Sequence, residues 1–134
     1  MRILMVIILF LHGMVHLLYA GHSKRIFEMV PGLAWPEGSW LLNRLPSETV
    51  RLLAVILLIT ADSLFTISGA GLLLQTNWWR IALVSAAVFS SSVFAVLWDG
   101  KMDNLPGKGA VGIVINLGLI LFSVLWGWIG LLSG

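Results

Sequence analysis

The chain contains no cysteine, which excludes a disulfide framework, a thiolate metal site and a Cys-x-x-Cys redox pair. Charge is also scarce, because Asp, Glu, Lys and Arg make up only 10% of the 134 residues while apolar residues make up 59%. The mean hydropathy of +1.00 is far too high for a soluble domain of this size. The net charge of +2 comes from scattered Lys and Arg rather than from a basic run, so no nucleic acid partner is expected. The composition predicts an integral membrane protein embedded in the lipid bilayer.

Four apolar runs divide the chain, and each is long enough to cross a hydrocarbon layer of about 30 Å as a helix. We predict an all-α membrane protein with a single transmembrane domain, residues 1–134. Short links force neighbouring helices to run in opposite directions, which favours an antiparallel bundle of four transmembrane helices. The predicted helices span residues 3–20, 48–75, 78–98 and 109–132.

The link between the first two predicted helices is the only long one, and it covers residues 21–49. It mixes charged residues and prolines with Trp35 and Trp40, which is typical of a segment at the headgroup level of a membrane. His22, at its start, is expected to be an interfacial anchor. Most of the Lys and Arg residues lie in or beside the first and third links. The positive-inside rule therefore predicts a multi-pass protein of the cell membrane with both termini outside.

Polar side chains within the apolar runs are the candidate functional residues, because hydrocarbon makes them costly unless they are paired. His12, His16 and Tyr19 are spaced i, i+4 and i+7, so they share one face of the first helix. Counting depth at about 1.5 Å per residue puts His12 level with Ser91 and Asn116, and we expect these three to form a polar layer. The candidates for a ligand or proton site are His12, His16, Asp62, Asn116, Ser91, Tyr19 and Asp99.

Asp62 is the sharpest single signal, because an ionised carboxylate near the bilayer centre costs about 2.5 to 3.5 kcal/mol even on the mildest insertion scale. We expect Asp62 to be protonated or paired, with His12 as its natural partner. Such a pair suits a proton relay, a set of metal ligands or an anchor for a substrate. The alternative interpretation is that Asp62 only hydrogen-bonds a neighbouring helix.

A metal site is one hypothesis for these residues. His12, His16 and Asp62 together match the two-His, one-carboxylate ligand set of non-haem iron sites. The sequence HGMVH lacks the glutamate of the metalloprotease motif. Two histidines on one helix cannot hold a haem from both sides, which leaves a single axial histidine as the haem option. The cofactor is therefore unknown, with metal and haem as options. Asp99 ends the third helix on the His16 side, and its alternative interpretation is a solvated turn residue.

The start LHGMVHLLY, the hydrophilic first link, and a third helix ending in LWDGK before an Asn-bearing fourth helix resemble a group of uncharacterised small prokaryotic membrane proteins. These proteins carry an N-terminal His-Gly-x-x-His motif and have four spans. In size and helix count the chain is more distantly similar to the DoxX-like proteins, some of which serve as membrane subunits beside a quinone-linked oxidoreductase. The resemblance implies the fold more than an activity. The matching residues are His12, Gly13, His16, Leu17, Trp98 and Asp99.

Two functional classes stay open. In the first, the protein is an accessory subunit or small oligomer whose polar core ties its helices together, within a homo-oligomer or a larger membrane complex. In the second, it is an intramembrane binder of an ion, a metal or a small apolar ligand, or a transporter or redox enzyme, that uses His12, His16 and Asp62. Convergence of His12 and Asp62 on a cavity would favour the second class, and separate bonds to neighbouring helices would favour the first.

Overall fold

A computed structural model describes the backbone of residues 1–132 and the side chains of residues 1–126. Within this range the chain is helical with no strand, which confirms the prediction of an all-α protein. The ends of the four long helices lie within three residues of the predicted positions. The elements are α1 (Arg2–Ser23), α2 (Ser47–Leu73), α3 (Trp79–Leu97), the short 3-10 helix η1 (Leu105–Lys108) and α4 (Ala110–Leu132).

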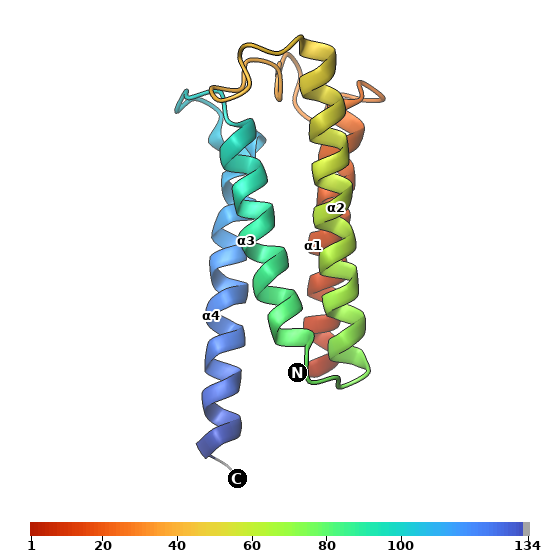
Figure 1. Ribbon diagram of the computed structural model, residues 1–134, viewed down its shortest axis with the longest axis vertical. Helices are drawn as coiled ribbons and strands as arrows, with labels where there is room; N and C mark the ends of the chain where they lie inside the picture. Colours follow the sequence, from red (N-terminus) through yellow and green to blue (C-terminus); the bar gives the residue numbers. More distant parts are fainter. Residues whose placement is uncertain (133–134) are drawn as a thin grey trace.

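The long helices lie side by side in chain order, with α1 packed on α2, α2 on α3 and α3 on α4 (Figure 1). Figure 1 shows the chain rising through α1, descending through α2, rising through α3 and descending through α4. The core consists of two apolar clusters stacked along the helices. Leu9, Phe65 and Leu83 belong to one cluster and Leu58 and Leu97 to the other, and all five are fully buried.

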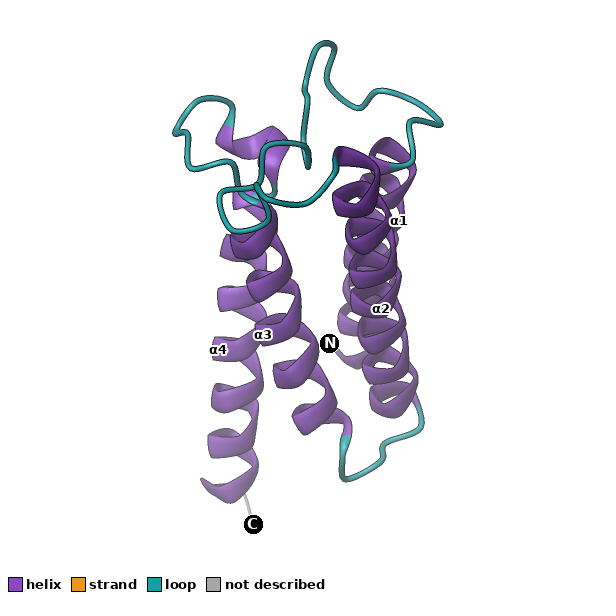
Figure 2. Cartoon of the chain, turned by 45° about the horizontal axis from the view of Figure 1, so that its top comes forward, coloured by secondary structure: helices purple, strands orange, loops and turns teal. Residues whose placement is uncertain are grey.

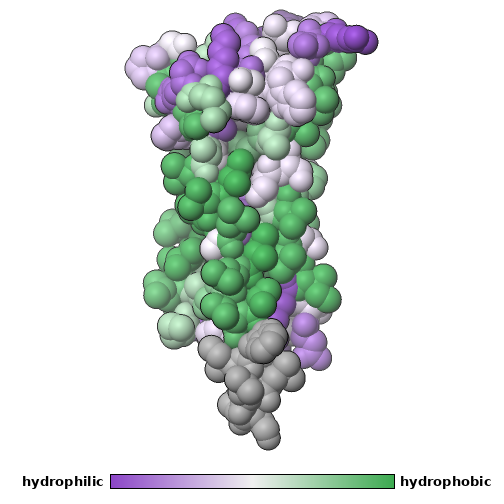
Figure 3. Space-filling view, turned by 90° about the vertical axis from the view of Figure 1, so that its left-hand side faces the viewer, coloured by the Kyte–Doolittle hydropathy of each residue, from purple (hydrophilic) through white to green (hydrophobic). Residues whose placement is uncertain are grey.

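Three helices, α1, α2 and α3, are long and apolar enough to cross a membrane. The part of α4 whose side chains are described, Ala110–Trp126, is apolar but shorter. Large apolar side chains point outward along these helices, for example Leu52 at 61% exposure and Val114 at 68%. Figure 3 shows the resulting apolar belt below a hydrophilic end, on the side that carries α4 at the left of Figure 1. These features support a membrane location.

The hydrophilic end is built largely from the link between α1 and α2, which loops over the ends of the helices (Figure 2). Part of this link closes the last turn of α3, where helical carbonyls have no partner within the helix. Ser39 Oγ donates to the carbonyl of Val96 at 2.5 Å, and Trp40 Nε1 donates to that of Ala95 at 2.8 Å. The link therefore acts as a cap on a helix that lies more than fifty residues away in the sequence.

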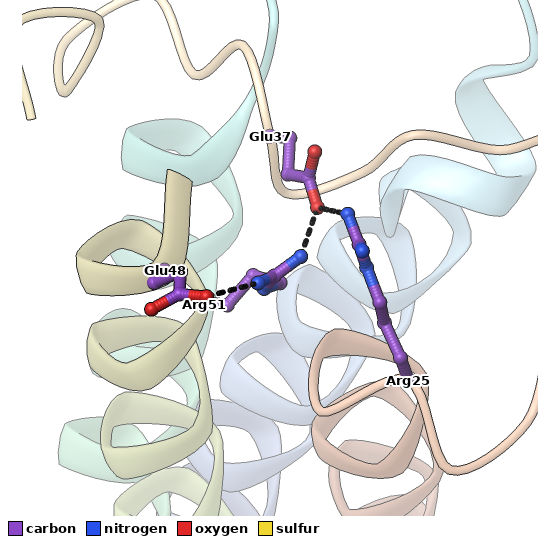
Figure 4. A network of polar contacts seen from close by, with 4 residues as sticks. All are labelled: Arg25, Glu37, Glu48 and Arg51. Carbon is purple, nitrogen blue, oxygen red and sulfur yellow. Dashed lines mark hydrogen bonds and ion pairs between the residues drawn. The ribbon is translucent and has the colours of Figure 1, made fainter. Parts of the chain in front are cut away.

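A charged cluster holds the same link to the end of α1 and to the start of α2 (Figure 4). Glu37 in the link accepts hydrogen bonds from Arg25, just after α1, and from Arg51 Nη1 in α2 at 2.7 Å. Glu48 lies 3.7 Å from Arg51 Nη2 on the outer side. Burial by itself would raise the pKa of the Glu37 carboxyl, but the two arginines outweigh that effect and the pKa is lowered.

Candidate functional site

A connected set of buried polar side chains joins α1, α3 and α4 at membrane depth. His12 Nε2 lies 2.8 Å from Asn116 Oδ1, and the amide nitrogen of Asn116 lies 3.0 Å from both Ser90 Oγ and Ser91 Oγ. Ser90 Oγ lies 2.7 Å from His16 Nε2, which closes the path back to α1. We call His12, His16, Ser90, Ser91 and Asn116 the polar core. The structure thus brings together the predicted layer of His12, Ser91 and Asn116.

One backbone contact fixes the direction of every hydrogen bond in the polar core. His16 Nδ1 lies 2.9 Å from the carbonyl oxygen of His12, so Nδ1 must carry the proton and donate it. His16 is fully buried and no acidic group of the described residues is hydrogen-bonded to it, so a neutral ring is favoured. Its Nε2 is then an acceptor, and the Ser90 hydroxyl donates to it.

The donors and acceptors in the other hydrogen bonds of the polar core follow from the direction of the Ser90 hydroxyl. Because Ser90 gives its proton to His16, its oxygen accepts from the amide group of Asn116, which also donates to Ser91. The carbonyl oxygen of Asn116 therefore faces His12, and His12 Nε2 is the donor. Each of these four contacts between side chains pairs a donor with an acceptor, which is the condition for a buried polar network to stabilise a fold.

Aromatic rings surround the two histidines. The ring of Phe65 lies 4.7 Å from that of His12, edge to face, and 5.5 Å from that of His16. Phe94 of α3 lies 5.6 Å from the His16 ring and 5.1 Å from the Tyr19 ring. A cavity of about 230 Å³ borders His12, His16, Tyr19 and Phe94 between α1 and α4. The two histidines of the polar core therefore border a small space between α1 and α4.

The predicted pairing of His12 with Asp62 is wrong. No hydrogen bond or ion pair joins Asp62 to another residue in the part of the chain with described side chains. Asp62 is half-buried and lies against Gly13, where the methyl group of an alanine would come within 2.9 Å of Asp62 Oδ1. The physical reason is the rotation of α2, which presents Phe65 rather than Asp62 to the histidines.

The predicted metal set of His12, His16 and Asp62 is not formed. Within residues 1–126, no group of three His, Asp or Glu side chains is arranged to hold a metal ion. Both nitrogens of His16 are already hydrogen-bonded, and the rings of His12 and His16 meet edge to face with centroids 5.2 Å apart. Asp62 lies outside this contact, so the three predicted ligands do not converge.

Tyr19 and Asp99 lie nearer the hydrophilic end. The Tyr19 hydroxyl donates to the carbonyl of Pro106 at 3.1 Å, so Tyr19 links α1 to η1 beside the cavity. Asp99 pairs with Lys108 rather than with His16, at 2.8 Å. Asp103 Oδ1 also lies 3.0 Å from the Lys108 ammonium, whose side chain is only 4% exposed. Burial alone would lower the pKa of Lys108, but the two carboxylates outweigh it and the pKa is raised.

Two residues central to the site were not predicted from the sequence. Ser90, rather than Ser91, is the hub of the polar core, and it is fully buried. A helical pattern pointed to it, because Ser90 shares a face with the buried residues Ala86, Ala87 and Val93. Phe65 carried no signal, because one phenylalanine in an apolar run looks like any other core residue.

Comparisons with models of known protein families, with curated proteins and with solved structures give no match for this chain. The resemblance to small proteins with a His-Gly-x-x-His motif, and more distantly to DoxX-like proteins, therefore stays a prediction. The function is therefore argued from three features of the structure, which are the polar core, the cavity beside it and the polar side chains of α2.

Proposed function

We propose that the chain is a multi-pass membrane protein whose four transmembrane helices form an antiparallel bundle, and that it acts as an accessory subunit or small oligomer. The observation that supports this function is Asp62, which is half-buried on α2 at the edge of its contact with Gly13 of α1 and has no hydrogen bond to any described residue. A carboxyl group at this depth needs a partner, since lipid tails offer none. A second transmembrane surface supplies one.

The neighbours of Asp62 make this surface polar as well. Ser63 and Thr66 are exposed on α2 within about one turn of Asp62, where a helix facing only lipid would carry apolar side chains. The Ser63 hydroxyl donates to a carbonyl of its own helix at 2.9 Å. The oxygens of Ser63 and Thr66 keep lone pairs for an acceptor role, while a protonated Asp62 is a donor. We call Asp62, Ser63 and Thr66 the α2 polar face.

A second copy of the same chain is the partner that fits this chemistry. Donors and acceptors on the α2 polar face complement each other across a two-fold axis, where the same patch is used twice. Interhelical hydrogen bonds of this kind are one of the forces that associate helices in lipid. The predicted similarity to DoxX-like membrane subunits agrees with such a role. The proposed orientation keeps the hydrophilic end, rich in Lys and Arg, in the cytoplasm and both termini outside.

The test is the oligomeric state of the purified chain in lipid nanodiscs, measured by native mass spectrometry and by cross-linking. We expect a dimer or small oligomer that Asp62→Leu converts to monomer, while Asp62→Asn, which keeps a donor and an acceptor, retains it. Ser92→Leu is the matched control, because Ser92 is an exposed serine on α3 bonded to its own helix at 2.9 Å. A monomeric wild-type chain, or an oligomer that survives Asp62→Leu, contradicts the proposal.

A second candidate function is supported by the cavity beside the polar core. A space of about 230 Å³ at membrane depth, bordered by two histidines and open between α1 and α4, is suited to a small ligand dissolved in the bilayer. In this function the polar core both holds the helices and shapes a binding site. The two candidate functions use different surfaces and can be tested separately.

A further inference from the structure

The hydrogen-bond direction of the polar core leaves one nitrogen with a defined role. Because His12 Nε2 donates to Asn116, Nδ1 of the neutral His12 ring carries a lone pair and is an acceptor. None of the described residues is hydrogen-bonded to this atom. A buried acceptor without a donor is costly, so this nitrogen calls for a partner that can donate.

The His12 Nδ1 atom is not sealed inside the protein. Among the described side chains, the nitrogen and oxygen atoms that are both enclosed and without a partner are His22 Nε2 and Trp35 Nε1. His12 Nδ1 is absent from this pair, so it keeps contact with open space although the residue as a whole is only 4% exposed. His12 lines the cavity between α1 and α4, and we infer that its Nδ1 atom faces that space.

The outer wall of the cavity faces the bilayer. Val15 of α1 and Val111 and Ile115 of α4 line it, and these side chains are 38%, 53% and 39% exposed. A molecule dissolved in the bilayer can therefore enter sideways between the two helices. No Lys, Arg, Asp or Glu lines the cavity, so a charged ligand finds no counter-charge there.

We propose that this cavity binds a small membrane-soluble phenol or alcohol whose hydroxyl group donates a hydrogen bond to His12 Nδ1. The inference rests on the second candidate function, because it names the class of ligand for the same cavity. The size agrees, since a dry cavity of about 150 Å³ holds benzene in another protein and this one is about 230 Å³. A ligand with acceptors alone would place its lone pairs against that of His12, so ketones and ethers bind more weakly.

The test compares 4-ethylphenol with its methyl ether, 4-ethylanisole, which has nearly the same shape but no donor. The chain, labelled with ¹⁵N-histidine, is titrated with each probe in lipid nanodiscs and followed by nuclear magnetic resonance. We expect the phenol to bind at least tenfold more tightly, which corresponds to about 1.4 kcal/mol. We also expect it to shift the His12 Nδ1 signal without adding a proton to the ring.

Two variants locate the binding site without touching the polar core. Ile115→Trp fills the outer wall of the cavity and is expected to abolish binding of the phenol. Leu117→Trp places the same side chain at a position on α4 that is 61% exposed and lines no part of this cavity, and it should leave binding unchanged.

The outcomes distinguish failure of the cavity as a ligand site from failure of the inferred need for a donor on the ligand. If both probes bind equally and Ile115→Trp blocks both, the cavity binds apolar molecules but the inferred need for a donor is wrong. If neither probe binds, or if binding survives Ile115→Trp, the second candidate function fails together with this inference. Either result leaves the oligomer proposal standing, because the α2 polar face is on another surface.

Discussion

Two polar regions lie at membrane depth, and they differ in how their hydrogen bonds are completed. The polar core on α1, α3 and α4 completes its bonds within one chain, with donor and acceptor matched at each step from His16 to His12. The α2 polar face does not, because the Ser63 hydroxyl bonds to its own helix and Asp62 has no partner among the described residues. Polar groups in hydrocarbon can thus hold a single chain together or prepare it to meet another.

The largest effect should come from breaking the polar core at Asn116. Asn116→Leu keeps the side-chain size but removes the partner of His12 and the donor to Ser90 and Ser91. Buried groups left without partners destabilise the fold, and we expect a loss of about 2 kcal/mol in the free energy of unfolding. Unfolding in mixed detergent micelles measures it.

Replacement of Asp62 by leucine tests whether the α2 polar face, unlike the polar core, contributes little to the stability of the single chain. Asp62→Leu should leave the unfolding free energy of the monomer within about 0.5 kcal/mol of wild type, because no bond inside the chain is lost. If Asp62→Leu destabilised the monomer as strongly as Asn116→Leu, the distinction between the two regions would be wrong.

An effect smaller than that of Asn116→Leu is expected at Gly13 of α1, which lies against Asp62 of α2. A methyl group added there would meet Asp62 Oδ1 at 2.9 Å and the backbone oxygen of Asp62 at 3.4 Å. The carboxylate is the atom group that must shift, so Gly13→Ala should cost about 1 kcal/mol. The double variant Gly13→Ala with Asp62→Ala removes the clashing carboxylate and keeps a good helix former, and recovery of stability in thermal unfolding would place the strain at this contact. Gly118→Ala is the control, because no atom lies within 4 Å of a methyl group there.

A further small effect should be the pH response, which distinguishes the neutral polar core from the charged hydrophilic end. Burial would raise the pKa of Asp99, but Lys108 outweighs it and the pKa is lowered. A lowered carboxyl pKa contributes stability above the ordinary value near 4, and this is lost as the pH falls through the lowered value. The raised pKa of Lys108 has the opposite sign, so its contribution is complete below about 10.4 and is lost at higher pH.

We therefore expect the thermal midpoint to fall between pH 7 and pH 3, by an amount equivalent to less than about 1 kcal/mol for Asp99 because its side chain is partly exposed. Lys108→Met should reduce this dependence on pH, and Arg51→Met should reduce the part that comes from Glu37. A dependence that is the same in both variants and in the wild type would show that these ion pairs do not set it.

Sequence reasoning recovered the helices, because four apolar runs and their lengths determine where a chain can cross hydrocarbon. It also placed His12 with Asn116, since counting residues gives the depth of a side chain along its helix. It failed for Asp62 because depth does not fix the rotation of a helix about its axis. That rotation depends on packing, here of Phe65 on two histidine rings. The cap that Ser39 and Trp40 place on α3 joins distant segments and leaves no local pattern.

The position of Asn116 in the middle of the polar core has a consequence for charge movement across the membrane. Protons hop along a chain of groups that can each take up one proton and release another, as imidazoles, hydroxyls and water do. An amide side chain donates and accepts hydrogen bonds but does not exchange its protons in this way. Since Asn116 is the link between His12 and the serines, it interrupts any such path between the two histidines. The hydrogen-bonded path of the polar core is thus not a proton relay, although it runs between two histidines.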